Sequence, residues 1–377
     1  MSLRAEKTLT SAQTAEPPAH QSHTRQKLDR SSLGYIVRTG LAGGLAGCSA
    51  KTLIAPLDRI KILFQTSNPH YKQFSGSLGG WVRAGREIAR SDGLIGFYQG
   101  HSATLLRVFP YAAIKFISYE QVRRVLIPSP DHETAIRRLL SGSIAGLCSV
   151  FVTYPLDLIR VRLAFQTKKE SPHYIDIHHK EHVHHLRQGR LTRTIAEIYR
   201  EHPIVDKQFF LINWLKKTLP VSMSQMSNFY RGFIPTIMGM IPYAGVSFLS
   251  HDVIHDIMRS PIISRYTVDQ TAPIPQNTDN HRARVPLNTW AQLIAGGLAG
   301  MVAQTSSYPF EVIRRRMQVG GVNNGQFIGM KEITLRIWKE RGFRGFYIGL
   351  SIGFIKIAPM MATSFYVYER CKFYLGI

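Results

Sequence analysis

The sequence predicts an all-α membrane protein with six transmembrane helices in three tandem repeats of pseudo-threefold symmetry, plus short surface helices. Two observations predict this fold: a motif that occurs three times, and six apolar segments long enough to cross a bilayer. The motif, Pro-x-acid-x-x-base, comprises Pro56, Asp58 and Lys61, then Pro155, Asp157 and Arg160, then Pro309, Glu311 and Arg314.

The repeat is regular around this motif. A glycine stands thirteen residues before each proline, at Gly43, Gly142 and Gly296, and a second glycine follows four residues later. Each copy then contains an aromatic-x-Gly sequence (FYQG, FYRG or FYIG) and an apolar stretch that ends in an acid. The copies differ in length only through added loops. We therefore predict that all three copies fold into the same structural unit.

These landmarks divide the chain into a disordered tail over 1–33, repeats over 34–127, 128–260 and 287–377, an insertion at about 167–228, and a linker over 261–286. The predicted membrane helices span 35–63, 101–122, 137–163, 232–255, 289–317 and 346–370. Glycine, serine and proline interrupt all six, so a hydropathy scan understates them. Within each repeat, a polar and partly amphipathic stretch predicts a short helix on the membrane surface.

The composition limits the partners. A formal net charge of +23 favours anionic partners such as nucleic acid, phospholipid head groups or small polyanions. Cys48, Cys148 and Cys371 lack the spacing of a disulfide scaffold or a zinc module. The histidines between His173 and His185 are interpreted as part of a solvated loop, so no metal and no cofactor is predicted.

Between their ends, the predicted spans carry ionisable residues of one sign. Away from the helix-end motifs, which include the acids that end the second helix of each repeat, the spans contain Lys51, Arg107, Lys115 and Lys356 and no carboxylate, and Arg38 lies near a helix start. Charge at bilayer depth is costly and usually faces a cavity, so these bases indicate an anionic, phosphorylated ligand in the interior. The alternative for some of them is to reach the membrane surface, and Lys115 lies off the face shared by Arg107 and Lys356.

The motif itself predicts a closable ring. Proline bends a helix, and the acid and base that follow it lie three residues apart on one face. Three such helices place three acids and three bases around one axis. In a low dielectric these pairs close a passage that the binding of a ligand can open. Ion pairs at a solvated helix end would explain one copy, but not three in register.

Because each motif is followed by aromatic-x-Gly, the sequence resembles the mitochondrial carrier family over residues 34–372. The resemblance implies a monomeric, multi-pass protein of the mitochondrial inner membrane that moves a small anion by alternating access and is not an enzyme. It also implies a matrix gate in which each acid pairs with the base of another repeat. The implied pairs are Asp58 with Arg160, Asp157 with Arg314, and Glu311 with Lys61.

The resemblance implies further gate residues. The family's bracing glutamines are matched by Gln65 in the first repeat and Gln318 in the third, whereas Ala164 occupies this position in the second repeat. The missing glutamine predicts a lower barrier at the matrix gate. The family's cytoplasmic gate is matched by Glu120 with Arg123, Asp252 with His255, and Glu369 with Lys372. His255 replaces a permanent cation, so this gate is expected to weaken when the imidazole loses its proton.

Substrate contacts in the family lie halfway along the second helix of each repeat. Counting back thirteen residues from each terminal acid gives Arg107, Gly239 with Met240, and Lys356. A glycine followed by an aliphatic residue resembles the adenine contact of nucleotide-type carriers, because glycine lets a flat ring approach the backbone. Arg107 and Lys356 would then hold phosphates, and Lys51 would attract the anion. Ordinary helix packing is the alternative for Gly239 and Met240.

The sequence RRRMQV at 314–319 departs from the RRRMMM expected of an ADP/ATP exchanger. Segments such as KTLIAPLDRIKILFQTSNPHY look like the carrier group linked to mitochondrial coenzyme A accumulation and the Graves disease carrier. The residues alone indicate an adenine-bearing anion, and coenzyme A comes from the resemblance. An adenine nucleotide carrier and a non-transporting receptor with the carrier fold remain alternatives.

The family's cardiolipin sites are matched by Gly100, Gly232 and Gly349, each of which opens a helix whose free N–H groups favour phosphate. A plain helix start is the competing interpretation. A basic nucleic-acid-binding protein would account for the charge but needs no membrane spans, so no nucleic-acid partner is predicted.

Overall fold

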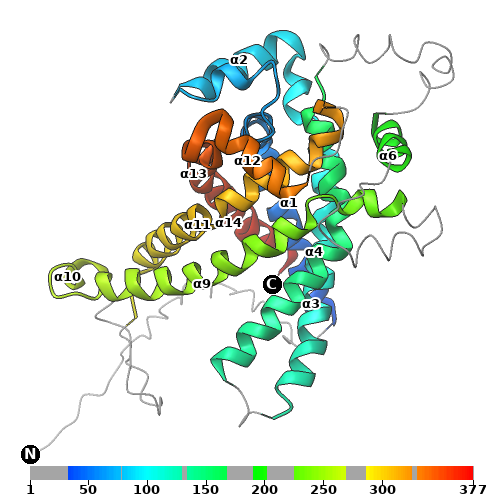
Figure 1. Cartoon of the computed structure of the whole chain (residues 1–377). Helices are drawn as coiled ribbons and strands as arrows, with labels where there is room; N and C mark the ends of the chain where they lie inside the picture. The colour runs from blue at the N-terminus through cyan, green and yellow to red at the C-terminus, as the bar shows by residue number, and fades with distance from the viewer. Residues whose placement is uncertain are drawn as a thin grey trace, which may run out of the picture.

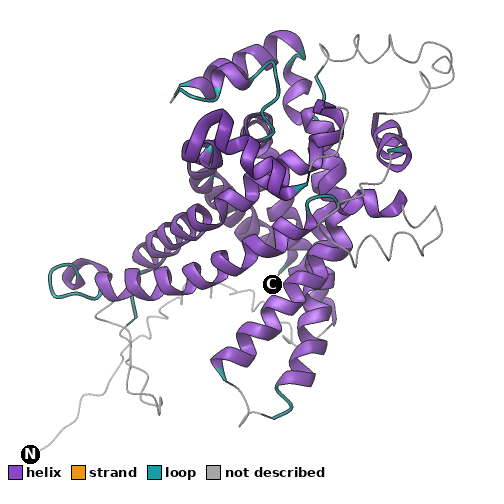
Figure 2. Ribbon diagram, in the orientation of Figure 1, coloured by secondary structure: helices purple, strands orange, loops and turns teal. Residues whose placement is uncertain are grey.

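The computed structural model describes residues 33–77, 79–129, 134–167, 190–201, 225–268, 286–324 and 329–376. Within these ranges the chain is helical (Figure 2), and its only β-type pairing is a single bridge between Val268 and Leu287. The predicted tail up to residue 32, the histidine-rich stretch and most of the predicted linker lie outside the described residues.

Long helices form at the six predicted places. They are α1 (Leu33–Gln65), α3 (His101–Leu126), α4 (Ala135–Phe165), α9 (Phe233–Met258), α11 (Thr289–Asn324), and α13 (Leu350–Ile355) followed by α14 (Ile357–Leu375). The sixth place differs from the prediction of one helix, because a turn at Lys356 divides it. Pro359 has no N–H to bond the carbonyl of Ile355, which favours a break at this point.

Short helices lie between the two long helices of each repeat. They are α2 (Gly80–Ser91), α6 (Arg190–Arg200) and α12 (Met330–Arg341). Each buries an apolar face against the motif-bearing helix of its own repeat, as when Ile88 of α2 packs in one cluster with Ile60 and Leu63 of α1. The remaining short elements are η1 (Lys72–Phe74), η2 (Leu94–Tyr98), η6 (Ser227–Tyr230), α10 (Ser264–Thr267) and η7 (Gly342–Tyr347).

The long helices form a ring in chain order. The most extensive contacts join adjacent repeats: α3 lies along α4, α9 along α11, and α14 along α1 (Figure 1). We call the ends of α1, α4 and α11 that carry the three prolines the motif end. The pairs converge there, and the α3/α4 and α9/α11 pairs diverge toward the opposite end (Figure 1). The helices of the ring are therefore closest to one another at the motif end.

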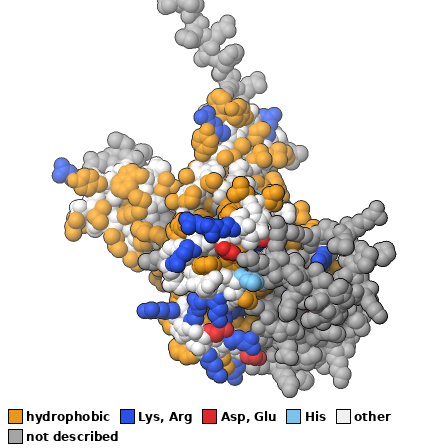
Figure 3. All heavy atoms as spheres, turned by 90° about the horizontal axis from the view of Figure 1, so that it is seen from above, with side chains coloured by type: hydrophobic (Ala, Val, Ile, Leu, Met, Phe, Trp, Pro, Cys, Tyr) orange, Lys and Arg blue, Asp and Glu red, His pale blue; other side chains and the backbone are white. Residues whose placement is uncertain are grey.

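A buried apolar cluster joins the repeats at the motif end. Ile62 of the first repeat packs with Val161 and Phe165 of the second and Val319 of the third. Elsewhere, large apolar side chains such as Phe116 of α3 and Phe248 of α9 are exposed, as expected of helices that face lipid. Figure 3 shows hydrophobic side chains over the projecting parts of the molecule and Lys and Arg side chains gathered on its central part.

Length and composition alone select three described stretches as membrane spans: Arg137–Phe165, Ser227–Met258 and Met330–Leu375. The helices that carry the first and third motifs are not among them. This agrees with the expectation that a hydropathy scan understates helices interrupted by glycine, serine and proline.

Candidate functional site

The three motifs meet in three partly buried ion pairs between repeats. Arg160 Nη2 lies 2.7 Å from Asp58 Oδ2, and Arg314 Nη2 lies 2.5 Å from Asp157 Oδ2. Lys61 Nζ lies 2.9 Å from Glu311 Oε1. These are the pairs implied from the sequence, and together they connect each repeat to both of the others.

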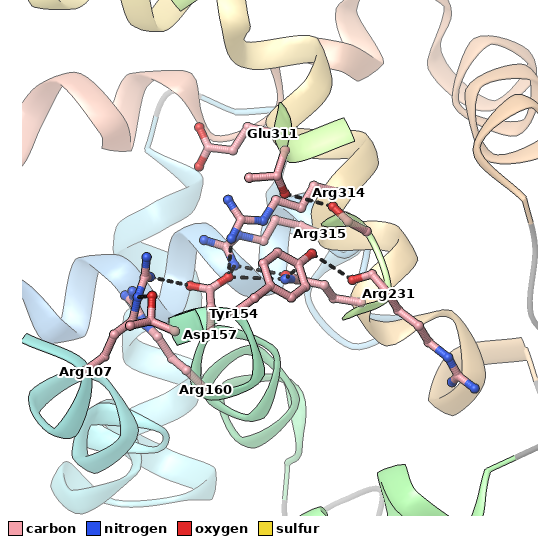
Figure 4. A network of polar contacts seen from close by, with 12 residues as sticks. Arg107, Tyr154, Asp157, Arg160, Arg231, Glu311, Arg314 and Arg315 are labelled. Atoms are coloured by element: carbon pink, nitrogen blue, oxygen red, sulfur yellow. Dashed lines mark hydrogen bonds and ion pairs between the residues drawn. The ribbon is translucent and has the colours of Figure 1, made fainter. Parts of the chain in front are cut away.

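Two of the bases assigned to substrate also bond these acids. Arg107 of α3 donates from Nη1 to Asp157 Oδ1 at 3.0 Å, and Lys356 donates to Asp58 Oδ1 at 2.8 Å. Figure 4 shows Arg107 and Arg314 reaching Asp157 from different elements. The equivalent position in the second repeat is Gly239, which has no side chain to offer Glu311. The three acids are therefore not equivalent.

Arg315 adds a base that the sequence analysis missed. Its Nη1 lies 3.1 Å from Asp157 Oδ2 and donates to Gln318 Oε1 at 3.0 Å (Figure 4). Asp157 thus accepts from three arginines, and Gln318 Nε2 donates to it as well at 3.2 Å. The run of three arginines at 314–316 could have indicated this residue. Only the first of them, Arg314, stands at the position of the motif base.

Lys51 lies in the same charged cluster. Asp58 attracts it, whereas Lys356, Arg160 and Arg107 repel it. Its Nζ donates to the Met360 thioether at 3.8 Å across the α1/α14 contact. Lys115, which the sequence placed off this face, is exposed.

The predicted bracing glutamines bond tyrosines of other repeats. Gln65 Nε2 donates to Tyr308 Oη at 3.0 Å, and Gln318 Nε2 donates to Tyr154 Oη at 3.2 Å. Each tyrosine stands directly before a motif proline, a signal that the sequence analysis did not use. At the third interface this tyrosine position is Ala55, opposite Ala164, so both partners of the brace are replaced.

Gly239 and Met240 pack against neighbouring helices. A Cβ at Gly239 would lie 3.1 Å from the Phe310 Cβ, so α9 and α11 are close here. The Met240 Cε would lie 3.6 Å from a Cβ at Gly146 of α4. The packing interpretation of this pair therefore has direct structural support, and the adenine contact stays a prediction.

At the opposite end, two contacts of the predicted gate residues lie within a single helix. Lys372 lies 3.5 Å from Glu369 of its own helix, and His255 stacks on His251 with ring centroids 4.0 Å apart. The side chains of Glu120 and Asp252 are exposed. This arrangement agrees with helix pairs that diverge toward this end.

The three helix-opening glycines pack against the bases of the motif. Gly100, Gly232 and Gly349 have φ angles of +81°, +79° and +83°, which favour glycine. A Cβ at Gly100 would lie 2.6 Å from the Arg160 carbonyl oxygen, and one at Gly232 would lie 3.1 Å from that of Arg314. These glycines therefore have a packing role, beside which lipid binding remains a prediction.

A ring of six membrane-spanning segments with a charged interior, tied by ion pairs at one end, defines a membrane solute carrier. A sequence profile of mitochondrial carrier proteins matches residues 34–130, 131–261 and 285–377. The chain is 52% identical over 365 residues to Mitochondrial carrier protein LEU5 of Saccharomyces cerevisiae, covering 94% of this chain and 95% of the relative. It is 37% identical to human Solute carrier family 25 member 16, covering 90% and 88%. It is 34% identical to Mitochondrial carrier protein CoAc2 of Zea mays, covering 92% and 88%.

The chain belongs to the mitochondrial carrier family. It is a solute transporter and not an enzyme, and it is a multi-pass protein of the mitochondrial inner membrane. In accord with the family resemblance, the motif end is called the matrix end below, and the opposite end the cytoplasmic end.

Proposed function

We propose that the chain carries coenzyme A, or a close adenine-bearing phosphorylated anion, by alternating access. One observation supports this most: among the described residues, six bases bond three acids at the matrix end, and Lys51 lies beside them. These seven bases exceed the three acids by four positive charges. Coenzyme A has three phosphate groups and about four negative charges at neutral pH, so it would neutralise this surplus.

The shared bases provide a way to couple binding to opening. Phosphate groups of the substrate would compete with Asp157 for Arg107 and with Asp58 for Lys356. Each base drawn to the substrate removes one bond from a gate acid. The ion pairs of the matrix gate then weaken only when substrate is present, because opening an empty gate leaves buried charges without partners.

The arrangement of the helices corresponds to a carrier that is closed to the matrix. The gate pairs Asp58 with Arg160, Asp157 with Arg314 and Glu311 with Lys61 are formed. The predicted cytoplasmic gate residues are Glu120, Arg123, Asp252, His255, Glu369 and Lys372. We propose that they come together between repeats when the matrix gate opens.

The adenine assignment rests on Gly239 and Met240, and the choice of coenzyme A rests on the resemblance to its carrier group. Gln318 and Val319, where an ADP/ATP exchanger would have methionines, favour this choice over an adenine nucleotide carrier. Dephospho-coenzyme A and adenosine 3',5'-diphosphate share the adenine and phosphate chemistry and belong to the same proposal.

A lipid role is proposed for the turns at Gly100, Gly232 and Gly349. None of the three helix starts has a side-chain cap, so the N–H groups of the first turn are available to a phosphate. Cardiolipin is the expected lipid, and the expected state is a monomer. Raised thermal stability with cardiolipin, and none with phosphatidylcholine, would support this role.

The test is uptake of labelled coenzyme A and labelled ADP by liposomes that hold the purified chain. We expect saturable coenzyme A uptake that unlabelled coenzyme A inside the liposomes accelerates. ADP uptake without coenzyme A uptake would favour the adenine nucleotide carrier. Binding of either compound without uptake would favour the receptor. Arg107→Gln, with a neutral side chain of similar reach, serves as the transport-deficient control.

A further inference from the structure

The contacts between repeats at the matrix end include three latches. We define a latch as a base that bonds both an acid at the end of the short helix of its own repeat and an atom of another repeat. The latch bases are Arg59, Arg162 and Arg316, and their acids are Asp92, Glu201 and Glu340. None of the six belongs to the gate pairs.

Each latch crosses one repeat interface. Arg162 donates from Nε to the Gln318 carbonyl oxygen at 2.5 Å, which joins the second and third repeats. Arg316 Nη2 donates to Ser67 Oγ at 2.6 Å, which joins the third and first repeats. Arg59 donates to the Ala164 and Gln166 carbonyl oxygens at 3.4 and 3.2 Å, which joins the first and second repeats.

The first latch comes from a different sequence position. Arg162 and Arg316 stand seven residues after their motif prolines, where the first repeat has Leu63. Arg59 stands three residues after Pro56, where the other repeats have buried apolar residues. The contact is thus kept in all three interfaces although the residue that makes it has moved.

Arg59 is also the most enclosed of the latches. Its side chain is 1% exposed and that of Asp92 is 0% exposed, with Nη2 and Oδ2 2.7 Å apart. The guanidinium also donates to the Gly96 carbonyl oxygen, before the turn that leads to Gly100. It therefore holds the end of α4, whose last carbonyls lack helical partners, against the loop of the first repeat.

The interface that Arg59 crosses is the one without a glutamine–tyrosine brace. The other two interfaces combine a latch with a brace, Gln318 with Tyr154 and Gln65 with Tyr308. Between the first and second repeats, Ala55 and Ala164 stand at the brace positions and line a small gap beside Arg59. No side chain at these two positions can add a polar contact across it.

We propose that Arg59, held by Asp92, is the positioning residue on which closure between the first and second repeats depends. The other interfaces keep a brace when their latch is removed. This interface keeps the Asp58–Arg160 and Arg107–Asp157 pairs, the hydrogen bond from Asn68 Nδ2 to the Phe165 carbonyl oxygen and apolar packing, but it has no brace. Loss of Arg59 should therefore open the matrix end more than loss of Arg316, although both bases occupy comparable places. The inference rests on the proposed function only in that the matrix end opens during transport.

The test measures access to the interior from the matrix side. The chain carries Cys48→Ser, Cys148→Ser and Cys371→Ser, with Met360→Cys as the reporter beside Lys51. A membrane-impermeant maleimide is added to inside-out inner-membrane vesicles. Arg59→Met with Asp92→Asn leaves no orphan charge, and we expect it to raise the labelling rate about tenfold. Arg316→Met with Glu340→Gln, the matched control, should raise it about twofold or less.

Two further variants separate a positioning role from loss of folding. Ala55→Tyr with Ala164→Gln supplies the missing brace, and it should return labelling of the Arg59 variant to near the parent rate. Adding Gln65→Ala to the Arg316 variant should raise its labelling to that of the Arg59 variant. Equal labelling of the two latch variants, or no rescue by the grafted brace, would overturn the inference. Labelling needs no particular substrate, so its outcome is independent of whether coenzyme A is transported.

Discussion

Arg107 of α3 and Asp157 of α4 lie 3.0 Å apart, so a base assigned to the substrate is also a partner of a gate acid. The Arg107 side chain is partly exposed, whereas that of Asp157 is buried. The base can therefore be reached by a ligand while the acid cannot. This difference in access gives the substrate a route to the gate through Arg107.

The first prediction concerns this shared base. Arg107→Gln should lower coenzyme A uptake about tenfold or more, because a charge-assisted hydrogen bond to phosphate is lost. Lys115→Gln removes a positive charge from the same helix, but from an exposed site off this face. It should leave uptake within about twofold of the parent. Initial uptake rates at several substrate concentrations provide the comparison, and equal losses in the two variants would contradict the assignment.

The second prediction concerns the simplest gate pair. Lys61 Nζ lies 2.9 Å from Glu311, and no second ion-pair partner of Glu311 is found among the described residues. Glu311→Lys places three or more positive charges together and should abolish uptake. The double exchange, Lys61→Glu with Glu311→Lys, restores opposite charges and should recover a measurable part of it.

A matched exchange tests whether this recovery depends on simple pairing. Exchanging Asp157 and Arg314 in the same way should give less recovery, because the new acid at 314 and base at 157 would meet Arg107 and Arg315 as well. Recovery of similar size in both exchanges would show that the additional arginines do not act on Asp157.

The repeat could be predicted because three copies constrain one another. Pro-x-acid-x-x-base at matching positions indicates which acids and bases face the axis, and the family resemblance then implied the pairing of Asp58 with Arg160. Arg59 and Arg315 could not be found in this way, because the other repeats have no equivalent base at these positions. A residue that breaks the repeat is not visible to an argument that rests on the repeat.

The bond of the predicted substrate contact Lys356 to a gate acid, and the helix break at this residue, were also not predicted from the sequence. Pro110, Pro242 and Pro359 stand three residues after the three contact positions, yet only Pro359 lies beside an interrupted helix. The proline is thus common to the three repeats, and Arg107 makes the same kind of bond to Asp157 as Lys356 makes to Asp58. Neither feature by itself predicts which helix is interrupted.

The third prediction separates an adenine contact from packing at Gly239. Gly239→Val would press on Phe310, so both interpretations expect lower thermal stability. Only the adenine contact expects a change in selectivity. Adenosine 3',5'-diphosphate should then inhibit coenzyme A uptake about tenfold less well, while 4'-phosphopantetheine, which has no adenine, should inhibit as before. If both compounds inhibited coenzyme A uptake less well to the same extent, packing would be the sole role of Gly239.

The last prediction concerns His255 at the cytoplasmic end. The other two acids of this end are followed by Arg123 and Lys372, which stay charged at physiological pH, whereas an imidazole ordinarily loses its proton at about pH 6.5. Below this pH, the charged ring can pair with a carboxylate such as Asp252 when the gate closes. Above it the cation is lost and the closed gate weakens, so the uptake rate should change between about pH 6 and pH 8.

His255→Lys fixes the charge over this range and should make uptake independent of external pH. The stacked His251, with ring centroids 4.0 Å away, provides the comparison, because it is an imidazole at the aromatic position of the gate pattern, where the other repeats have Tyr119 and Tyr368, and not at the position of the base. His251→Gln should keep the pH dependence of the parent. The measurement is initial uptake at fixed internal pH, and a His255→Lys variant with the pH profile of the parent would remove His255 from the gate.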